Sequence, residues 1–226
     1  MCASSQIHQI DLVRNSNKMS TIIIGFNGQF KKNADSDNSD ISQLMINVES
    51  PIAEHEHIWI WDHFFSLVLN RLSKNEESAQ ALLDQMSEWA VGFANKMYAP
   101  INELHAEGAL KIDKNIRIEK SLNDCDEIIM IEINSQPESW PTVHAKIADS
   151  ASEEKLTTSV IALAQYFLSN NTNFFRELPM HVLGMRKYYS DEIPFTSEES
   201  IAGAPAFSFN LALKFYQDLD QKMQRQ

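Results

Sequence analysis

The stretch STIIIGFNGQF, at residues 20–30, decides the fold class, because it predicts a β-strand in the first part of the sequence. β-Branched and aromatic residues dominate this stretch, as is typical of strands, and the glycine within it predicts a break. A second strand is predicted at residues 43–50 (QLMINVES). The polar residues between these two stretches are typical of a hairpin connection.

Two more strands are predicted in the middle of the chain, at residues 115–120 (NIRIEK) and 127–134 (EIIMIEIN). In the first of them, isoleucine alternates with charged residues, which is the period of a half-buried strand. Residues 134–155 follow, with two prolines and several small polar residues. This stretch is predicted to be a long loop, and it is the candidate junction if the chain contains two subdomains.

Helices are predicted in the other long segments. Ser50 and Pro51 are typical of an N-cap and a first turn, so we expect a helix from there to about residue 72. This helix is apolar on nearly all sides, which predicts a central position. The clearest apolar stripe, with spacings of three and four residues, covers residues 79–97. Further helices are predicted at 156–168, at 172–189 with an interruption at Pro179, and at 207–223.

The order of these elements indicates the class of fold. Strands and helices are segregated along the chain, which favours α+β over a doubly wound parallel sheet. We therefore expect a helix-rich α+β fold with a small, mainly antiparallel sheet of about four strands, packed with about five helices. Residues 19–226 are predicted to form one domain, and the polar residues 1–18 to be a flexible leader.

Composition narrows the function classes. The chain has 226 residues, of which 43% are hydrophobic, and 19 Lys and Arg against 31 Asp and Glu give a formal net charge of −12. So acidic a surface repels phosphates and anionic lipids, which argues against nucleic-acid and membrane partners. Cys2 and Cys125 lack the spacing of a redox or zinc motif, and no apolar run is long enough to span a membrane. These features predict a cytoplasmic protein.

One run of the sequence, EHEHIWIWDH at residues 54–63, contains several side chains of the kinds that bind metals. Imidazole and carboxylate groups are good ligands for zinc, iron or manganese, so a divalent metal site is one hypothesis. The alternative is that the histidines are structural residues at the edge of the core. The candidate ligands are His55, His57, Asp62 and His63.

Two other groups of residues give weaker hypotheses. Glu177 and His181 have the spacing of metal ligands on one helical face and are candidates to complete a site with the histidines, although Pro179 between them predicts a break in that helix. Aromatic residues at helical spacing usually belong to a core, but they can also line an apolar ligand pocket. The candidate pocket residues are Trp59, Trp61, Trp89 and Phe93.

The sequence contains none of the common hydrolase, nucleotide-binding or dinucleotide-binding motifs, so an enzyme is the less favoured interpretation. The preferred hypothesis is a regulatory, adaptor or inhibitor-like protein that acts through protein contacts or self-association. Its candidate contact residues are Tyr188, Tyr189, Phe215 and Tyr216. The alternative is a metal-dependent enzyme or metal-binding protein that uses the cluster of His55, His57 and His63.

Overall fold

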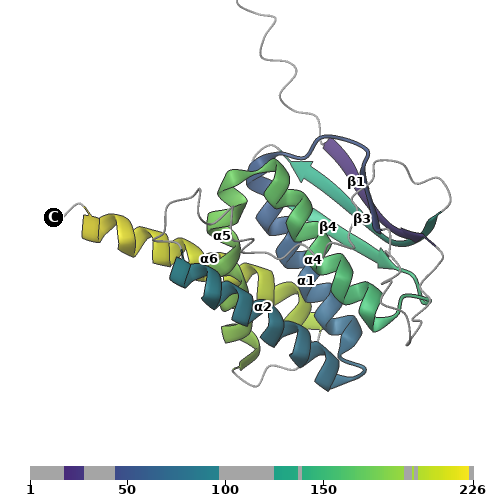
Figure 1. Cartoon of the computed structure of the whole chain (residues 1–226). Helices are drawn as coiled ribbons and strands as arrows, with labels where there is room; N and C mark the ends of the chain where they lie inside the picture. Colours follow the sequence, from purple (N-terminus) through teal and green to yellow (C-terminus); the bar gives the residue numbers. More distant parts are fainter. Residues whose placement is uncertain are drawn as a thin grey trace, which may run out of the picture.

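A four-stranded antiparallel sheet with the order β2-β1-β3-β4 forms one side of the molecule in the computed structural model (Figure 1). The structure describes residues 18–27, 44–96, 125–136, 139–190, 195 and 198–223. The first two strands form the predicted antiparallel pair, and the other two form a second hairpin. The strands are β1 (Lys18–Asn27), β2 (Leu44–Val48), β3 (Cys125–Gln136) and β4 (Ser139–Ile147).

Helices cover one face of this sheet in two layers. α1 and α4 lie next to the strands, since α1 contacts β4 and α4 contacts β2, and the remaining helices pack behind them (Figure 1). The described residues thus show a helix-rich α+β fold with an antiparallel sheet and five α-helices, as the sequence predicted. The helices are α1 (His57–Leu72), α2 (Glu76–Lys96), α4 (Glu153–Asn170), α5 (Thr172–Ser190) and α6 (Glu198–Met223).

α1 is the central element of the molecule, as its nearly continuous apolar surface predicted. It contacts α2, α4, α5, α6 and β4. Trp61, Phe64 and Phe65 on this helix are fully buried. Burial of one such side chain contributes about 1.5–3 kcal/mol, so this helix is the main source of core contacts.

The prediction of a loop over residues 134–155 is wrong in its middle part, which forms β4. Pro141 misled the prediction, because proline cannot donate to a strand ladder. β4 is one of the two edge strands of the sheet, and proline is tolerated at an edge. Val143 on the inner face is buried, whereas Thr142 and His144 on the outer face are exposed. This alternation is the strand signal that the prolines obscured.

A β-bulge interrupts the pairing of β3 with β4. Asn134 pairs with Thr142 and Gln136 pairs with Ser139, so one residue of β3 lies opposite two residues of β4. Those two residues are Trp140 and Pro141. A bulge redirects the side chains of the bulged strand, and this one places Trp140 beside α1.

Three helix boundaries differ from the predictions. α1 begins after a 3-10 turn, η1 (Glu54–Glu56), rather than at Pro51, because the Glu56 carboxylate and backbone both bond to Ala53. α5 continues through Pro179, since burial of Leu178 and Val182 outweighs one lost backbone hydrogen bond. α6 begins well before residue 207 and contains Pro205 in its interior.

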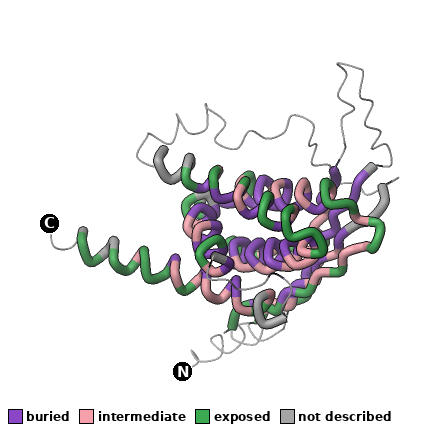
Figure 2. The backbone as a smooth tube through the Cα atoms, turned by 90° about the horizontal axis from the view of Figure 1, so that it is seen from below, coloured by how far each residue is buried: buried purple, intermediate pink, exposed green. Residues whose placement is uncertain are grey.

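The C-terminal turns of α6 extend beyond the buried body of the protein (Figure 2). Leu213 and Phe215 on these turns are 46% and 44% exposed. None of the helices that the structure describes is both long and apolar enough to cross a membrane. The strand predicted at 115–120 lies outside the described residues.

Candidate functional site

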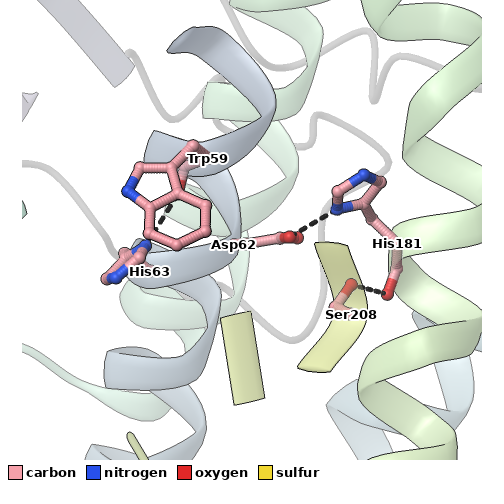
Figure 3. A network of polar contacts seen from close by, with 5 residues as sticks. All are labelled: Trp59, Asp62, His63, His181 and Ser208. Carbon is pink, nitrogen blue, oxygen red and sulfur yellow. Dashed lines mark hydrogen bonds and ion pairs between the residues drawn. The ribbon is translucent and has the colours of Figure 1, made fainter. Parts of the chain in front are cut away.

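A buried pair of ionisable side chains joins α1 to α5. His181 Nδ1 donates a hydrogen bond to Asp62 Oδ2 over 2.5 Å. The side chain of Asp62 is 0% exposed and that of His181 is 3% exposed. Figure 3 shows Asp62 pointing from α1 toward His181 on α5. Such a pair is positioned by helix packing, because its residues are 119 positions apart in the sequence.

α6 supports the pair from a third direction. The Ser208 hydroxyl donates to the backbone carbonyl of His181 over 2.8 Å (Figure 3). Gly184, one turn further along α5, lies so close to this point that an added Cβ would be 2.8 Å from the Ser208 Cα. The close approach of α5 and α6 therefore depends on a residue without a side chain. The His181 ring also meets the Phe209 ring edge-on, with centroids 6.0 Å apart.

A second carboxyl group lies within electrostatic reach of the pair. Glu177 precedes His181 by one helical turn and is half-buried. Burial raises the pKa of Glu177, the charge of His181 opposes this shift, and the charge of Asp62 adds to it. The Oδ1 atom of Asp62 is buried and has no hydrogen-bond partner among the described residues. The junction of α1, α5 and α6 thus contains carboxylate oxygens that can accept a further donor.

An aromatic cluster lies on the other side of Phe209. The rings of Trp59 and Trp140 stack with centroids 5.1 Å apart, and Phe209 meets Trp140 edge-on at 4.5 Å. The Trp59 indole donates from Nε1 to the Pro141 carbonyl over 3.0 Å, which fixes α1 to the bulge of β4. Trp140 nevertheless remains 43% exposed. Phe209 and Leu213 are four residues apart on α6, so they are neighbours on the helix surface. We call Trp140, Phe209 and Leu213 the aromatic flank.

His63 belongs to the same side of α1 as Trp59 (Figure 3). Its ring packs against the indole at 4.5 Å, and Nδ1 donates to the Trp59 carbonyl over 3.0 Å. Burial lowers the pKa of His63 despite the opposing effects of this hydrogen bond and of Asp62. His63 is therefore a neutral side chain that supports the cluster at neutral pH.

His57 lies at a different junction, where η1 meets the turn between α4 and α5. Its ring stacks on Phe167 at 4.3 Å, and the Asn171 amide donates to its Nδ1 over 3.4 Å and to the Glu54 carbonyl over 2.8 Å. Burial is the main cause of the lowered pKa of His57, and the charge of Glu54 opposes the shift. This arrangement is what a structural histidine requires.

The proposed metal ligands are thus separated in space. His55 is exposed, His57 contacts Phe167 and Asn171, His63 contacts Trp59, and Asp62 points away from His63 toward His181. Within the part of the chain that the structure describes, no group of three or more His, Cys, Asp or Glu side chains is arranged to hold a metal ion. The helical geometry accounts for this, because successive residues turn by about 100° around the axis.

The residues of the hypothetical ligand pocket are also dispersed. Trp61 is fully buried and donates from Nε1 to the Val160 carbonyl, so it is a core residue. Trp59 contributes to the aromatic cluster, whereas Trp89 is a half-buried residue of α2. The side chain of Phe93 lies outside the described residues.

The four candidate contact residues differ in exposure. Tyr189 is 7% exposed and its hydroxyl bonds to Ser66, which places it in the core. Tyr188 is half-buried, and its ring packs against Phe207. The Tyr216 hydroxyl donates to the Arg176 carbonyl, and Phe215 is 44% exposed.

Sequence reasoning missed two residues of the aromatic flank. Trp140 was missed because residues 134–155 were interpreted as a loop. The neighbouring Pro141 does not exclude a strand, since proline is tolerated in an edge strand. Leu213 was not among the residues singled out in the helix predicted at 207–223. α5 is continuous through Pro179, so Glu177 and His181 do lie one turn apart on a helix, whereas their role as further metal ligands stays a prediction.

Comparison of the chain with protein-family models, with curated proteins and with solved structures finds no match in any of the three. The class that the structure defines is therefore the architectural one: a helix-rich α+β protein with a four-stranded antiparallel sheet.

Proposed function

We propose that the protein acts by binding another protein through the aromatic flank, in a regulatory, adaptor or inhibitor-like role. One observation carries the proposal: Trp140 is 43% exposed although two aromatic rings hold it in place. A tryptophan that is already ordered loses little conformational freedom when a partner covers it. Tryptophan is also one of the residue types that dominate binding energy at interfaces.

The surroundings of Trp140 extend the same surface. Leu213 is 46% exposed and follows Phe209 by four residues on α6, and the Phe209 ring meets Trp140. Contiguous exposed apolar groups on a folded protein commonly mark a contact surface. Phe215, one of the predicted contact residues, is also exposed, but it lies about 160° around α6 from Leu213. The two residues therefore belong to different sides of the helix, and Leu213 is the one on the side of Phe209.

The proposed setting is the cytoplasm, and the proposed partner is neither nucleic acid nor membrane. The small number of cysteines, 2 in 226 residues, supports the first point, because disulfides are rare in that compartment. The formal net charge of −12 supports the second.

Variants that remove exposed apolar groups test the proposal. Trp140→Ala and Leu213→Ala are compared with Val91→Ala, because Val91 is also 46% exposed but lies on α2. We expect the wild-type protein and Val91→Ala to retain the same partner from a cell extract, and both flank variants to lose it. Circular dichroism and urea unfolding establish that each variant is folded. Retention of that partner by Trp140→Ala would contradict the proposal.

A metal measurement tests the alternative hypothesis of a metal-dependent enzyme. Protein purified without a histidine tag or chelator is analysed by elemental mass spectrometry. Stoichiometric zinc, iron or manganese that disappears in His55→Ala and His63→Ala would favour this alternative over a purely protein-binding role.

A further inference from the structure

The Asn171 side chain joins the start of α5 to the turn η1. Its Oδ1 accepts hydrogen bonds from the backbone N–H groups of Asn173 and Phe174 over 2.9 and 3.3 Å, so it caps α5. This cap fixes the orientation of the amide group, because only its oxygen can accept from two donors. The Nδ2 group therefore points the other way, toward the Glu54 carbonyl at 2.8 Å and His57 Nδ1 at 3.4 Å.

His57 fits this arrangement in its neutral form. The two hydrogens of the Asn171 amide are directed at the Glu54 carbonyl and at His57 Nδ1, so Nδ1 is an acceptor. The ring also has a hydrogen bond with the backbone of Ile52. A protonated imidazole carries a hydrogen on both nitrogens, so its Nδ1–H would meet the N–H of the amide. Protonation of His57 thus replaces an attractive contact with a repulsive one.

The corner between α4 and α5 offers no charge that would stabilise a protonated ring. His57 is 5% exposed and stacks on Phe167. Residues 163–175 of the two helices contain no acidic or basic side chain, and Tyr166 is their one titratable group. Among the described residues, the charges that act on His57 all belong to η1: Glu54, Glu56 and His55. The two acidic groups therefore move with His57 if η1 leaves the corner.

From this geometry we infer that His57 and Asn171 form a proton-sensitive latch, which holds η1 on the α4–α5 corner and releases it when His57 is protonated. Rotation of the amide would break both bonds of the α5 cap, so the histidine is the part that moves. The released ring enters water beside Glu54 and Glu56, whose charges stabilise the imidazolium. The later turns of α1 stay in place through fully buried side chains such as Trp61.

The direction of the switch follows from the pKa of His57. Burial lowers this pKa below 6.5 while the latch is closed, against the opposing charge of Glu54. In the released turn the ring returns to its ordinary pKa of about 6.5. The released state thus binds more protons, so the ratio of closed to open protein falls below about pH 6.5, by up to about tenfold per pH unit.

Backbone amide exchange tests the inference. Protection factors are measured by NMR between pH 7.5 and pH 5.5, on protein dialysed against a chelator so that metal binding does not contribute. The Glu56 N–H, which bonds to the Ala53 carbonyl over 2.9 Å, reports on η1. The amides of β3, which pairs with a strand on either side, report on the rest of the fold.

We expect the protection factor of the Glu56 N–H to fall roughly threefold to tenfold over this range, while those of β3 stay constant. His57→Gln should abolish the fall, because glutamine can still accept from Asn171 but does not titrate. His63→Gln is the matched control and should behave as the wild type, since His63 is a second histidine of α1 whose pKa burial lowers.

Asn171→Asp should also abolish or reverse the fall. A carboxylate at this position still caps α5, and it accepts a hydrogen bond from a protonated His57. Constant protection of Glu56 in the wild type, the wild-type fall in His57→Gln or Asn171→Asp, or an equal fall in β3 would each overturn the inference. None of the latch residues belongs to the aromatic flank, so this inference and the proposed function can fail separately.

Discussion

His181 donates from Nδ1 to Oδ2 of Asp62 over 2.5 Å, and this contact joins helices that are far apart in the sequence. The pair is enclosed by α1, α5 and α6. Ser208 on α6 donates a hydrogen bond to the backbone carbonyl of His181. A carboxylate removed from water requires such a partner, because an unpaired buried charge costs several kcal/mol. The pair therefore constrains how α5 can sit against α1.

Loss of one member of the pair should be more damaging than loss of both. Asp62→Leu or His181→Leu alone leaves a buried polar group without its partner, and each should reduce the free energy of unfolding by about 3–5 kcal/mol. The double variant should lose clearly less than the sum of the two. Urea unfolding of the wild type, both single variants and the double variant measures the coupling. Additive losses would show that the contact contributes nothing to stability.

His57 and His63 should make the stability of the protein sensitive to mild acid. The folded-state pKa values of His57 and His63 lie below the model value of 6.5, mainly through burial. Below about pH 6.5 the unfolded chain therefore binds more protons than the folded protein, and stability falls as the pH falls. The slope is at most about 1.4 kcal/mol per pH unit for each histidine.

Urea unfolding between pH 7.5 and pH 5 checks this slope. The double variant His57→Gln, His63→Gln should lose most of the pH dependence in that range. His55→Gln is the matched control, because His55 is exposed. A double variant with the pH dependence of the wild type would contradict the assignment to these two histidines.

Glu177 should have the opposite sign. Burial and the charge of Asp62 raise its folded-state pKa above the model value of 4.5, against the effect of His181. The folded protein thus binds more protons than the unfolded chain above pH 4.5, so ionisation of Glu177 opposes folding as the pH rises. Glu177→Gln should raise the free energy of unfolding at pH 7 by about 0.5 kcal/mol or less, and the gain should vanish near pH 4. A variant less stable than the wild type at pH 7 would show that the carboxylate makes a favourable contact.

The two described glycines of α5 and α6 should respond differently to alanine. A Cβ on Gly184 would lie 2.8 Å from the Ser208 Cα, so the two helix backbones would have to separate. Gly184→Ala should cost about 1–3 kcal/mol. A Cβ on Gly203 would instead meet the Tyr188 hydroxyl, which is the end of a side chain. Because that ring can move and alanine favours the helix, Gly203→Ala should cost less. Thermal or urea unfolding of both variants compares them directly, and equal losses would contradict close helix packing at Gly184.

The sequence predicted the fold class because its two main signals are local. Alternating or continuous apolar residues identify β1, β2 and β3, and helical spacing identifies α1, α2 and α4. Prolines caused the main errors, at Pro141 in β4 and at Pro179 in α5. In both places, packing that depends on distant residues outweighed a local preference.

The candidate site was harder to predict for the same reason. The density of histidines at residues 54–63 suggested one cluster, whereas helix geometry sends His57, Asp62 and His63 to different neighbours. The partner of Asp62 is on α5, and the partner of Trp59 is on β4. Contacts between residues so far apart cannot be read from spacing within one segment.

The contact between Trp59 and Pro141 also changes what the β4 edge of the sheet offers to another strand. A strand added along β4, from a misfolded copy or an aggregate, would need a free N–H and a free carbonyl at alternate positions of its neighbour. Pro141 has no N–H, and its carbonyl already accepts a hydrogen bond from the Trp59 indole. Pro141 thus offers a further strand no donor, and its carbonyl is already engaged, so the indole that fixes the helix to the strand also makes the β4 edge a poorer template for such a strand.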